Sequence, residues 1–234
     1  MNTVFFKNLG IIDFKEAWEY QELLLASLIT KKRNKKKERL GPAGHLIFCQ
    51  HPHVYTLGKS GKETNLLLNS KELSSKGASF YKINRGGDIT YHGPGQLVVY
   101  PIFDLDYFFT DIHKYLRYLE DVVIDVLLSY GVVGGRVDGS TGVWVECNTL
   151  PPKKICAMGV RASRWVTMHG LAFNANVNLD YFNNIVPCGI IDKGVTSLEY
   201  ETSKFIDFND LELRFAKAFS SRFNIKLKNN DVKK

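Results

Sequence analysis

Cys188 has the sequence surroundings best suited to covalent chemistry. It lies between a proline and a glycine, which favour an ordered turn that can present a sulfur to a pocket. A nucleophilic cysteine reacts as its thiolate, so it needs a cation or a base nearby. The sequence offers Lys154, His92 and His169 for this purpose, and it does not tell which of them lies close to the sulfur.

The segment RGGDITYHGPGQ, residues 85–96, has the composition of a ligand-binding turn. Its glycines allow the backbone to approach a ligand closely, and the segment leads into an apolar strand. The glycine spacing matches neither the phosphate-binding P-loop nor the dinucleotide-binding pattern. A tight hairpin with Arg85 on the surface is the alternative, and the presence of Thr90 and His92 favours a binding site.

Two apolar strands carry the remaining candidates. In the first strand, strict alternation puts Lys154 on the same face as Cys156, Met158 and Val160. Lys154 then has one of two roles. It either lies at a sheet edge and prevents pairing with another chain, or it is partly buried and exchanges protons near pH 7. His169 lies in the second strand, where a histidine is more often a hydrogen-bonded core residue than a catalyst.

Hydrophobic spacing predicts the elements that position these residues. A capping box at Asp13 starts a helix over about 14–30, and Gly131 ends a second helix over about 112–130. A third helix is expected over about 210–223. Strands are expected at 46–49, 54–57, 97–100, 142–145, 154–160 and 166–174. Because strands and helices mix without strict alternation, the fold class is α+β or mixed α/β around one sheet.

The composition fits a globular chain of 234 residues. Four cysteines are too few for a disulfide framework and are not spaced for a metal, and there is no signal peptide, so we expect a cytoplasmic protein. The net charge of +7 is concentrated in residues 31–39; outside them, 24 basic and 23 acidic residues leave only +1. This distribution argues against a nucleic-acid binder.

The basic run is either a solvated loop or a docking patch for an acidic protein.

Six blocks of this sequence resemble the lipoyl(octanoyl) transferases, in that family's order and over nearly the whole chain. The blocks are HPHVYTLG (51–58), RGGDITYHGPGQ (85–96), TGVWV (141–145), KICAMGVR (154–161), HGLAFN (169–174) and PCG (187–189). The resemblance implies the α/β catalytic fold of biotin and lipoate protein ligases, with a central mixed β-sheet flanked by helices and a small β-subdomain. It implies one catalytic domain, residues 1–234, with a large lobe over about 1–185 and a smaller lobe over about 186–234.

The resemblance also implies roles for individual residues. Cys188 is expected to be the acyl-thioester nucleophile and Lys154 its acid/base partner, with His169 as a candidate for a supporting role. No metal site is expected. The expected substrate-binding residues are Arg85, Gly86, Gly87, Asp88, Ile89, Thr90, Tyr91, His92, Ala157, Met158, Gly159, Gly170, Leu171 and Ala172.

The reaction that the resemblance implies is transfer of an octanoyl group from octanoyl-acyl carrier protein to a lysine of lipoyl domains. The acceptors would be the E2 subunits of 2-oxoacid dehydrogenases and the H protein of glycine cleavage. Because the donor is already a thioester, held on the carrier's phosphopantetheine, no ATP and no metal cofactor is expected. Neither nucleic acid nor a membrane is an expected partner.

Three other functions remain compatible with the sequence. An ATP-dependent lipoate or biotin ligase of the same fold would not need a nucleophilic cysteine. A binding module for carrier proteins or nucleic acid would need neither Cys188 nor Lys154. A cysteine hydrolase would use water as the final acceptor.

Overall fold

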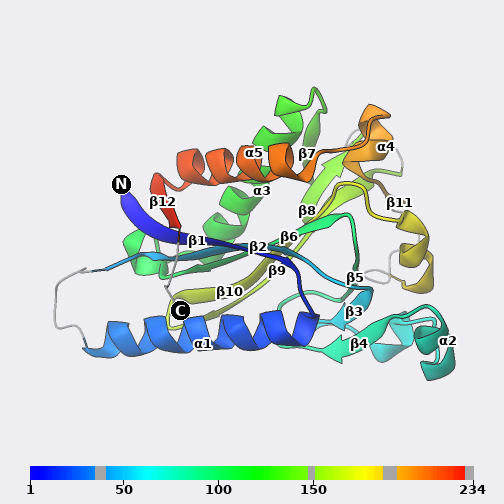
Figure 1. Cartoon of the computed structure of the whole chain (residues 1–234), viewed down its shortest axis with the longest axis horizontal. Coiled ribbons are helices and arrows are strands. Elements are labelled where there is room, and N and C mark those ends of the chain that lie inside the picture. Colours follow the sequence, from blue (N-terminus) through cyan, green and yellow to red (C-terminus); the bar gives the residue numbers. More distant parts are fainter. Residues whose placement is uncertain (35–40, 147–150, 187–193, 230–234) are drawn as a thin grey trace.

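The structure is a computed structural model, which describes residues 1–34, 41–146, 151–186 and 194–229. A large mixed sheet crosses the molecule, with helices on both faces (Figure 1). Within the described residues its strand order is β12-β1-β2-β6-β10-β9-β8-β7, and β11 pairs with β9. The strands are β1 (Asn2–Ile11), β2 (Gly44–Gln50), β6 (Gln96–Phe103), β7 (Gly134–Val137), β8 (Ser140–Val145), β9 (Lys153–Ser163), β10 (Val166–Asn174), β11 (Gly194–Val195) and β12 (Ile225–Asn229).

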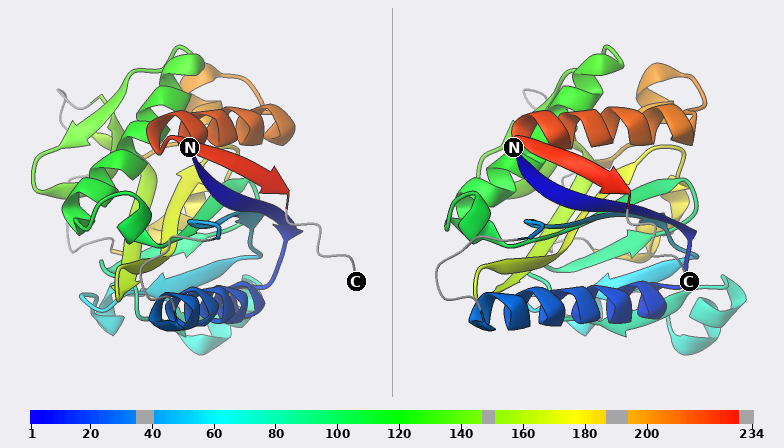
Figure 2. Two further views of the ribbon diagram at one scale, coloured as in Figure 1. Left: turned by 90° about the vertical axis from the view of Figure 1, so that its left-hand side faces the viewer. Right: turned by 60° about the vertical axis from the view of Figure 1, so that its left-hand side comes forward.

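The sheet is mixed because its parallel pairs join strands from distant parts of the chain. β1 pairs in parallel with β2 and with β12, and β11 pairs in parallel with β9, whereas the strands between β2 and β7 are antiparallel. Figure 2 shows β12 lying beside β1 near the N-terminus. The expected mixed sheet is therefore confirmed.

Three long helices cover the two faces of this sheet. α1 (Phe14–Asn34) covers one face, while α3 (Ile112–Ser129) and α5 (Phe208–Arg222) lie together on the other (Figure 1). α1 begins where expected, because the Asp13 carboxylate accepts hydrogen bonds from the backbone N–H groups of Lys15 and Glu16. A short helix, α4 (Leu198–Thr202), precedes α5.

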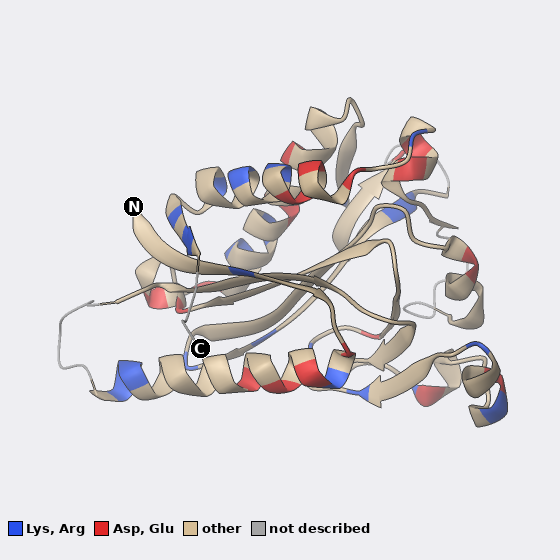
Figure 3. Cartoon of the chain, viewed as in Figure 1, with Lys and Arg blue, Asp and Glu red and all other residues tan. Residues whose placement is uncertain are grey.

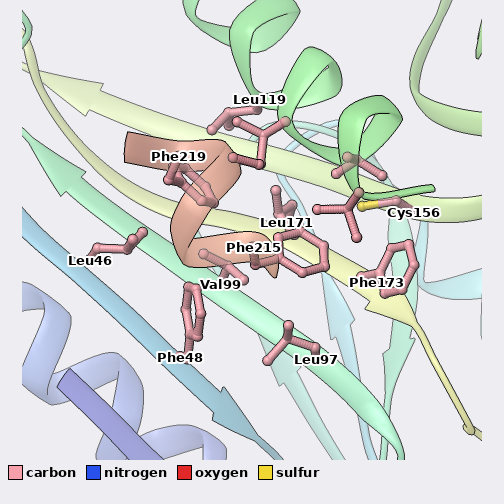
Figure 4. Packing of buried hydrophobic residues seen from close by; sticks show 14 of the residues in the cluster. Leu46, Phe48, Leu97, Val99, Leu119, Cys156, Leu171, Phe173, Phe215 and Phe219 are labelled. Atoms are coloured by element: carbon pink, nitrogen blue, oxygen red, sulfur yellow. The ribbon is translucent and has the colours of Figure 1, made fainter. Parts of the chain in front are cut away.

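The larger core lies between α3, α5 and the sheet (Figure 4). The Phe215 ring of α5 packs edge-on against Phe173 of β10, with ring centroids 5.2 Å apart, and against Phe48 of β2 at 6.4 Å. Edge-to-face packing at these distances is favourable for aromatic pairs. The described C-terminal helix is thus fixed to the centre of the large sheet.

A second, small sheet has the order β4-β3-β5. Its strands are β3 (Val54–Leu57), β4 (Ser79–Lys82) and β5 (Ile89–His92), and α2 (Ser70–Ser75) lies next to it. Three 3₁₀ helices complete the described elements: η1 (Glu63–Asn65), η2 (Leu105–Tyr107) and η3 (Leu179–Asn184). The small sheet supplies the expected β-subdomain. It is formed by residues 54–92, whereas the described part of the expected C-terminal lobe, 194–229, joins the large sheet through β11 and β12.

The first residues of the basic run differ from the expected solvated loop. Lys31, Lys32 and Arg33 form the last turn of α1, where positive charge is favoured by the helix dipole. The ammonium of Lys32 forms ion pairs with Asp104 at 2.7 Å and with Asp106 at 2.6 Å. Residues 35–39 of the run lie outside the described residues. Figure 3 shows acidic positions in the N-terminal half of α1 and basic positions at its C-terminal end. None of the described helices is long and apolar enough to cross a membrane.

Candidate active site

A cavity of about 500 Å³ lies where the two sheets meet. Its walls come from β6, β9 and β10 of the large sheet and from the glycine-rich segment that leads into β5. The structure brings most of the candidate residues of the sequence to this one cavity. Those that line it are Arg85, Gly86, Gly87, Asp88, Ile89, Thr90, His92, Lys154, Ala157, Met158, Gly159, His169, Gly170, Leu171 and Ala172.

Tyr91 is the exception within the glycine-rich segment. Successive side chains of a strand point to opposite faces, so Tyr91 points away from its neighbours Thr90 and His92. Its ring is fully buried in the core of the small sheet, and its hydroxyl lies 2.7 Å from Nδ1 of His53. Tyr91 therefore belongs to the packing of the small sheet and does not line the cavity.

Small residues form the floor of the cavity. Ala172 of β10 lies directly between Val98 of β6 and Ala157 of β9 in the register of the sheet, and Gly170 pairs with Gly159. Residues directly opposite one another share a face of a sheet, so these small side chains leave a hollow above the strands. Such a hollow is suited to a slender apolar group.

The glycine-rich segment covers this floor at close range. The N–H of Gly86 donates a hydrogen bond of 2.9 Å to the carbonyl oxygen of Val160 in β9. A Cβ on Gly159 would lie only 2.7 Å from the Gly86 oxygen and 3.0 Å from Cδ of Arg85, so only glycine permits this approach. The Arg85 guanidinium also donates to the backbone oxygen of Thr56 at 2.7 Å. These contacts attach the segment to both sheets.

His92 is a neutral histidine in the cavity wall. Burial, together with the nearby His51, lowers its pKa to about 3. Its Nδ1 lies 2.8 Å from the side-chain oxygen of Gln96, whose amide N–H donates to Asn174 at 2.9 Å. Because these contacts fix the imidazole in place, His92 acts as a rigid wall and a hydrogen-bonding group.

His169 is held in an unusual backbone conformation. It has φ of +59° although it is not a glycine, and its N–H donates to Oε1 of Gln21 at 2.9 Å. Its Nε2 lies 2.8 Å from the side-chain oxygen of Asn84. Burial, followed by the charges of Arg85 and Arg161, lowers its pKa to about 3. The expectation of a hydrogen-bonded buried histidine therefore agrees with its surroundings, although it also lines the cavity.

Lys154 lines the cavity from β9. Its Nζ lies 4.5 Å from the centre of the Trp144 ring, a distance that allows a cation–π interaction. The strict alternation expected from Lys154 onwards is broken. The register pairs Lys154 with Trp144 and Cys156 with Val143, so it skips Ile155. Cys156 is consequently buried in the large core, where burial raises the pKa of its thiol. Its side chain does not lie on the same face of β9 as that of Lys154.

Cys188 lies outside the described residues, together with its neighbours Pro187 and Gly189. The described chain on either side is attached to segments of the cavity wall. The N–H of Val186 donates to Asn65, whose side chain donates to the cavity residue Asp88 at 2.7 Å. On the other side, Val195 pairs with Lys154 in the register of β11 and β9.

A buried acidic residue lies behind Lys154. Glu120 of α3 is fully buried, and it accepts hydrogen bonds from Arg136 at 2.6 Å and from the N–H of Gly142 at 3.2 Å. Gly142 has φ of +116°, and a Cβ there would lie 2.5 Å from the Cys156 oxygen and 3.6 Å from Cε of Lys154. The Glu120 carboxylate thus fixes the backbone against which the Lys154 side chain lies. The sequence does not indicate a role for Glu120, because no local pattern distinguishes a buried acidic residue of a helix from an exposed one.

No cluster of three or more His, Cys, Asp or Glu residues that could hold a metal ion occurs in the parts of the chain that the structure describes. Several polar side chains of the cavity are hydrogen-bonded to protein atoms. The Asp88 carboxylate, for example, accepts from the N–H of Ile89 at 2.6 Å and from Asn65. The described cavity is therefore an apolar channel with a few fixed polar groups at its walls.

Comparison with known families identifies this arrangement. Residues 13–220 match the lipoyl protein ligase A/B catalytic domain. The chain belongs to this family. The match covers every described wall of the cavity, from Phe14 of α1 to Val195 of β11.

Close relatives within the lipoyl protein ligase A/B family carry the name octanoyltransferase. The protein of Cytophaga hutchinsonii is 53% identical over 232 residues, which cover 97% of this chain and 95% of that protein. The protein of Flavobacterium johnsoniae is 55% identical over 224 residues, or 94% and 97% of the two chains. The family resemblance and the enzyme class expected from the sequence, an acyltransferase, are thereby confirmed.

Solved structures of the family share the fold at low sequence identity. A bi-partite lipoate protein ligase from Thermoplasma acidophilum, studied with its E2 lipoyl domain, aligns with a TM-score of 0.68 at 14% identity, over 98% of this chain and 87% of that chain. Lipoate-protein ligase A bound with ATP aligns with a TM-score of 0.69 at 14% identity, over 98% and 88%. The expected ligase-like catalytic fold is therefore confirmed.

Proposed function

We propose that this enzyme transfers an octanoyl group from octanoyl-acyl carrier protein to a lysine of lipoyl domains, through a thioester on Cys188. The observation that carries the proposal is the position of Lys154 on the wall of an apolar channel with a floor of small side chains. Close relatives named octanoyltransferase support the choice of acyl group. A volume of about 500 Å³ is within the usual range for a small-molecule site.

In the first step the Cys188 thiolate attacks the thioester carbonyl of the donor. The C–S bond to the carrier breaks, its phosphopantetheine thiolate leaves and takes a proton from the Lys154 ammonium, and octanoyl-Cys188 remains beside a neutral Lys154. The Lys154 ammonium favours the thiolate form of the cysteine by charge attraction. The neutral His92 and His169 add no positive charge, and the Arg85 guanidinium is held by hydrogen bonds to Thr56 and to the Gly86 oxygen, so we assign this task to Lys154.

In the second step the lysine amine of the lipoyl domain attacks octanoyl-Cys188. The amide C–N bond forms, the C–S bond breaks, and the Cys188 thiolate is restored. The attacking amine must lose a proton, which a neutral Lys154 accepts as general base. Backbone N–H groups of the glycine-rich segment or of Gly189 are our candidates for holding the oxyanion.

This reaction needs neither ATP nor a metal, because the donor thioester is already activated. It needs a reduced Cys188, which agrees with a reducing compartment such as the cytoplasm. The fold neighbours include a ligase bound with ATP, so an ATP-dependent ligase is the second candidate. The two candidates differ in whether the cysteine becomes acylated.

Intact-protein mass spectrometry after incubation with octanoyl-acyl carrier protein, without ATP, tests the proposal. We expect one octanoyl adduct, which Cys188→Ala abolishes and which added lipoyl domain discharges. Lys154→Ala should slow both steps. Matched controls are Cys49→Ala, a buried cysteine outside the cavity lining, and Lys153→Ala, the neighbouring lysine, which is paired with Glu146.

Three results would contradict the proposal. The first is lipoyl-domain modification that occurs only with free octanoate and ATP, which would identify a ligase. The second is acylation that persists in Cys188→Ala. The third is release of free octanoate with no amide product, which would identify a hydrolase.

A further inference from the structure

The floor of the cavity contains a row of three residues that crosses three strands. Ala172 is the register partner of both Val98 in β6 and Ala157 in β9. Val98 and Ala172 are almost fully buried, at 1% and 3% exposure, and all three residues line the cavity. The side chains in this row therefore determine how far an apolar ligand can extend across the sheet.

Val98 is the last cavity-lining residue of this row, and beside it, two residues along β6, Tyr100 belongs to a rigid cluster of rings. The hydroxyl of Tyr100 lies 2.7 Å from Nε2 of His51, whose ring packs edge-on against His92. His92 in turn stacks on Phe14, with ring centroids 6.1 Å apart. Rings that are packed and hydrogen-bonded in this way cannot move aside at low cost, so the channel has a fixed end.

The dimensions of the row fit one acyl length. Two interstrand spacings separate Ala157 from Val98, which is roughly 10 Å. An extended eight-carbon acyl chain has seven C–C bonds and spans roughly 9 Å. Lys154 and Ala157 both line the cavity from β9, so an acyl chain whose thioester is held in the cavity near β9 can enter this row at Ala157.

We propose that Ala157, Ala172 and Val98 form a ruler that selects the length of the acyl chain, whose methyl end lies against Val98. The proposal rests on the acyl transfer proposed above and adds the residues that set its chain-length specificity. The two alanines leave space for the middle of the chain, and Val98 with the rings beside it sets the limit. A longer chain would have to displace these packed rings.

Val98→Ala tests the ruler, with Val99→Ala as its matched control. Both valines are buried in β6, but Val99 faces the large core on the opposite side of the sheet. We expect Val98→Ala to raise the ratio of kcat/KM for decanoyl over octanoyl donors at least tenfold, since each methylene in an apolar pocket changes discrimination by about 10-fold or more. Val99→Ala should leave the ratio within twofold of the wild type.

Ala172→Val tests the same ruler in the opposite direction. It should favour hexanoyl over octanoyl donors by at least tenfold, because the added methyl groups fill the middle of the channel. Ala162→Val, at an exposed position near the end of β9, is the matched control and should leave the preference unchanged. If Ala172→Val does not fold, Ala157→Val, at a half-buried position, replaces it.

Binding of free hexanoic, octanoic, decanoic and dodecanoic acids, measured by calorimetry, separates the ruler from the transfer reaction. A shift in acid preference in Val98→Ala supports the ruler even if the wild type forms no octanoyl adduct, in which case only the proposed function fails. Normal octanoyl transfer by the wild type with unchanged length preference in folded Val98→Ala and Ala172→Val would overturn the ruler and leave the function intact.

Discussion

The buried carboxylate of Glu120 allows a sharp test of what holds the site in place. It is fully buried, accepts hydrogen bonds from Arg136 Nε at 2.6 Å and from the N–H of Gly142 at 3.2 Å, and forms an ion pair with Arg117 at 2.8 Å. In Glu120→Gln, one oxygen becomes an NH₂ group. Since all three partners donate, the amide must point an N–H group at a donor in either orientation.

The expected loss follows from this geometry. The arginines themselves stay partly in solvent, since the side chain of Arg136 is 33% exposed and also pairs with Asp121, so the loss comes from the buried amide group that faces donors. A buried polar group left without a suitable partner costs about 1–3 kcal/mol. At the upper end this removes a large part of a typical stability of about 5–15 kcal/mol. For a chain of this size, about 3 kcal/mol corresponds to a fall in Tm of about 6–12 °C. Because Gly142 lies against the Lys154 side chain, kcat should fall as well.

Urea unfolding provides the assay. Glu120→Gln should lower the midpoint with an unchanged m-value. Arg117→Met is the control, because the Arg117 side chain is 48% exposed and its contribution should stay below about 1 kcal/mol. The double variant Glu120→Leu/Arg136→Met should lose less free energy of unfolding than the two single variants lose together. When both partners are replaced by apolar residues, no unpaired charge remains. A loss below about 1 kcal/mol in Glu120→Gln would refute the reasoning.

Three further predictions concern the cavity. In the folded chain the pKa of His169 is lowered to about 3, whereas in the unfolded chain it has its ordinary value of 6.5. Below pH 6.5 only the unfolded chain therefore binds this proton. As the pH is lowered from 6.5 to 4, this difference should reduce the free energy of unfolding by about 1.4 kcal/mol per pH unit. Thermal unfolding of His169→Asn should show a shallower pH slope than that of the wild type. Gly159→Ala should displace Gly86 and reduce kcat/KM roughly 100-fold, with a loss of about 1 kcal/mol in urea unfolding. Tyr91→Phe should lose about 1 kcal/mol of stability through its contact with His53 but leave KM for the acyl donor unchanged, and a raised KM would contradict its placement in the small core.

Much of the fold follows from hydrophobic spacing. Strands 54–57 and 166–174 are observed with the bounds expected, and α3 and α5 start and end within two residues of the prediction. β12 is not predicted, because its sequence IKLKN is short and carries two lysines, as suits an edge strand. Its place beside β1 depends on pairing across the whole chain, which no local pattern encodes.

The candidate site is less accessible to sequence reasoning than the fold. Residue types and glycine spacing indicate the segment 85–92 and Lys154, and alternation along β5 already implies that Tyr91 faces away from Thr90 and His92. The irregularity at Ile155 is not predictable, because it depends on the register between two strands. Family resemblance, rather than any local pattern, assigned the pocket residues of β9 and β10.

The parallel pairing of β1 with β12 affects how the protein is made. Asn2 is aligned with Ile225, so β1 is synthesised more than 200 residues before the strand that pairs with its second edge (Figure 2). Until then β1 exposes a row of free N–H and C=O groups, which invites pairing with other chains. Contacts this distant in sequence also slow folding, because the loop they close is long. Chains that lack residues beyond 224 are therefore expected to aggregate through β1, because they lack the strand that covers its outer edge.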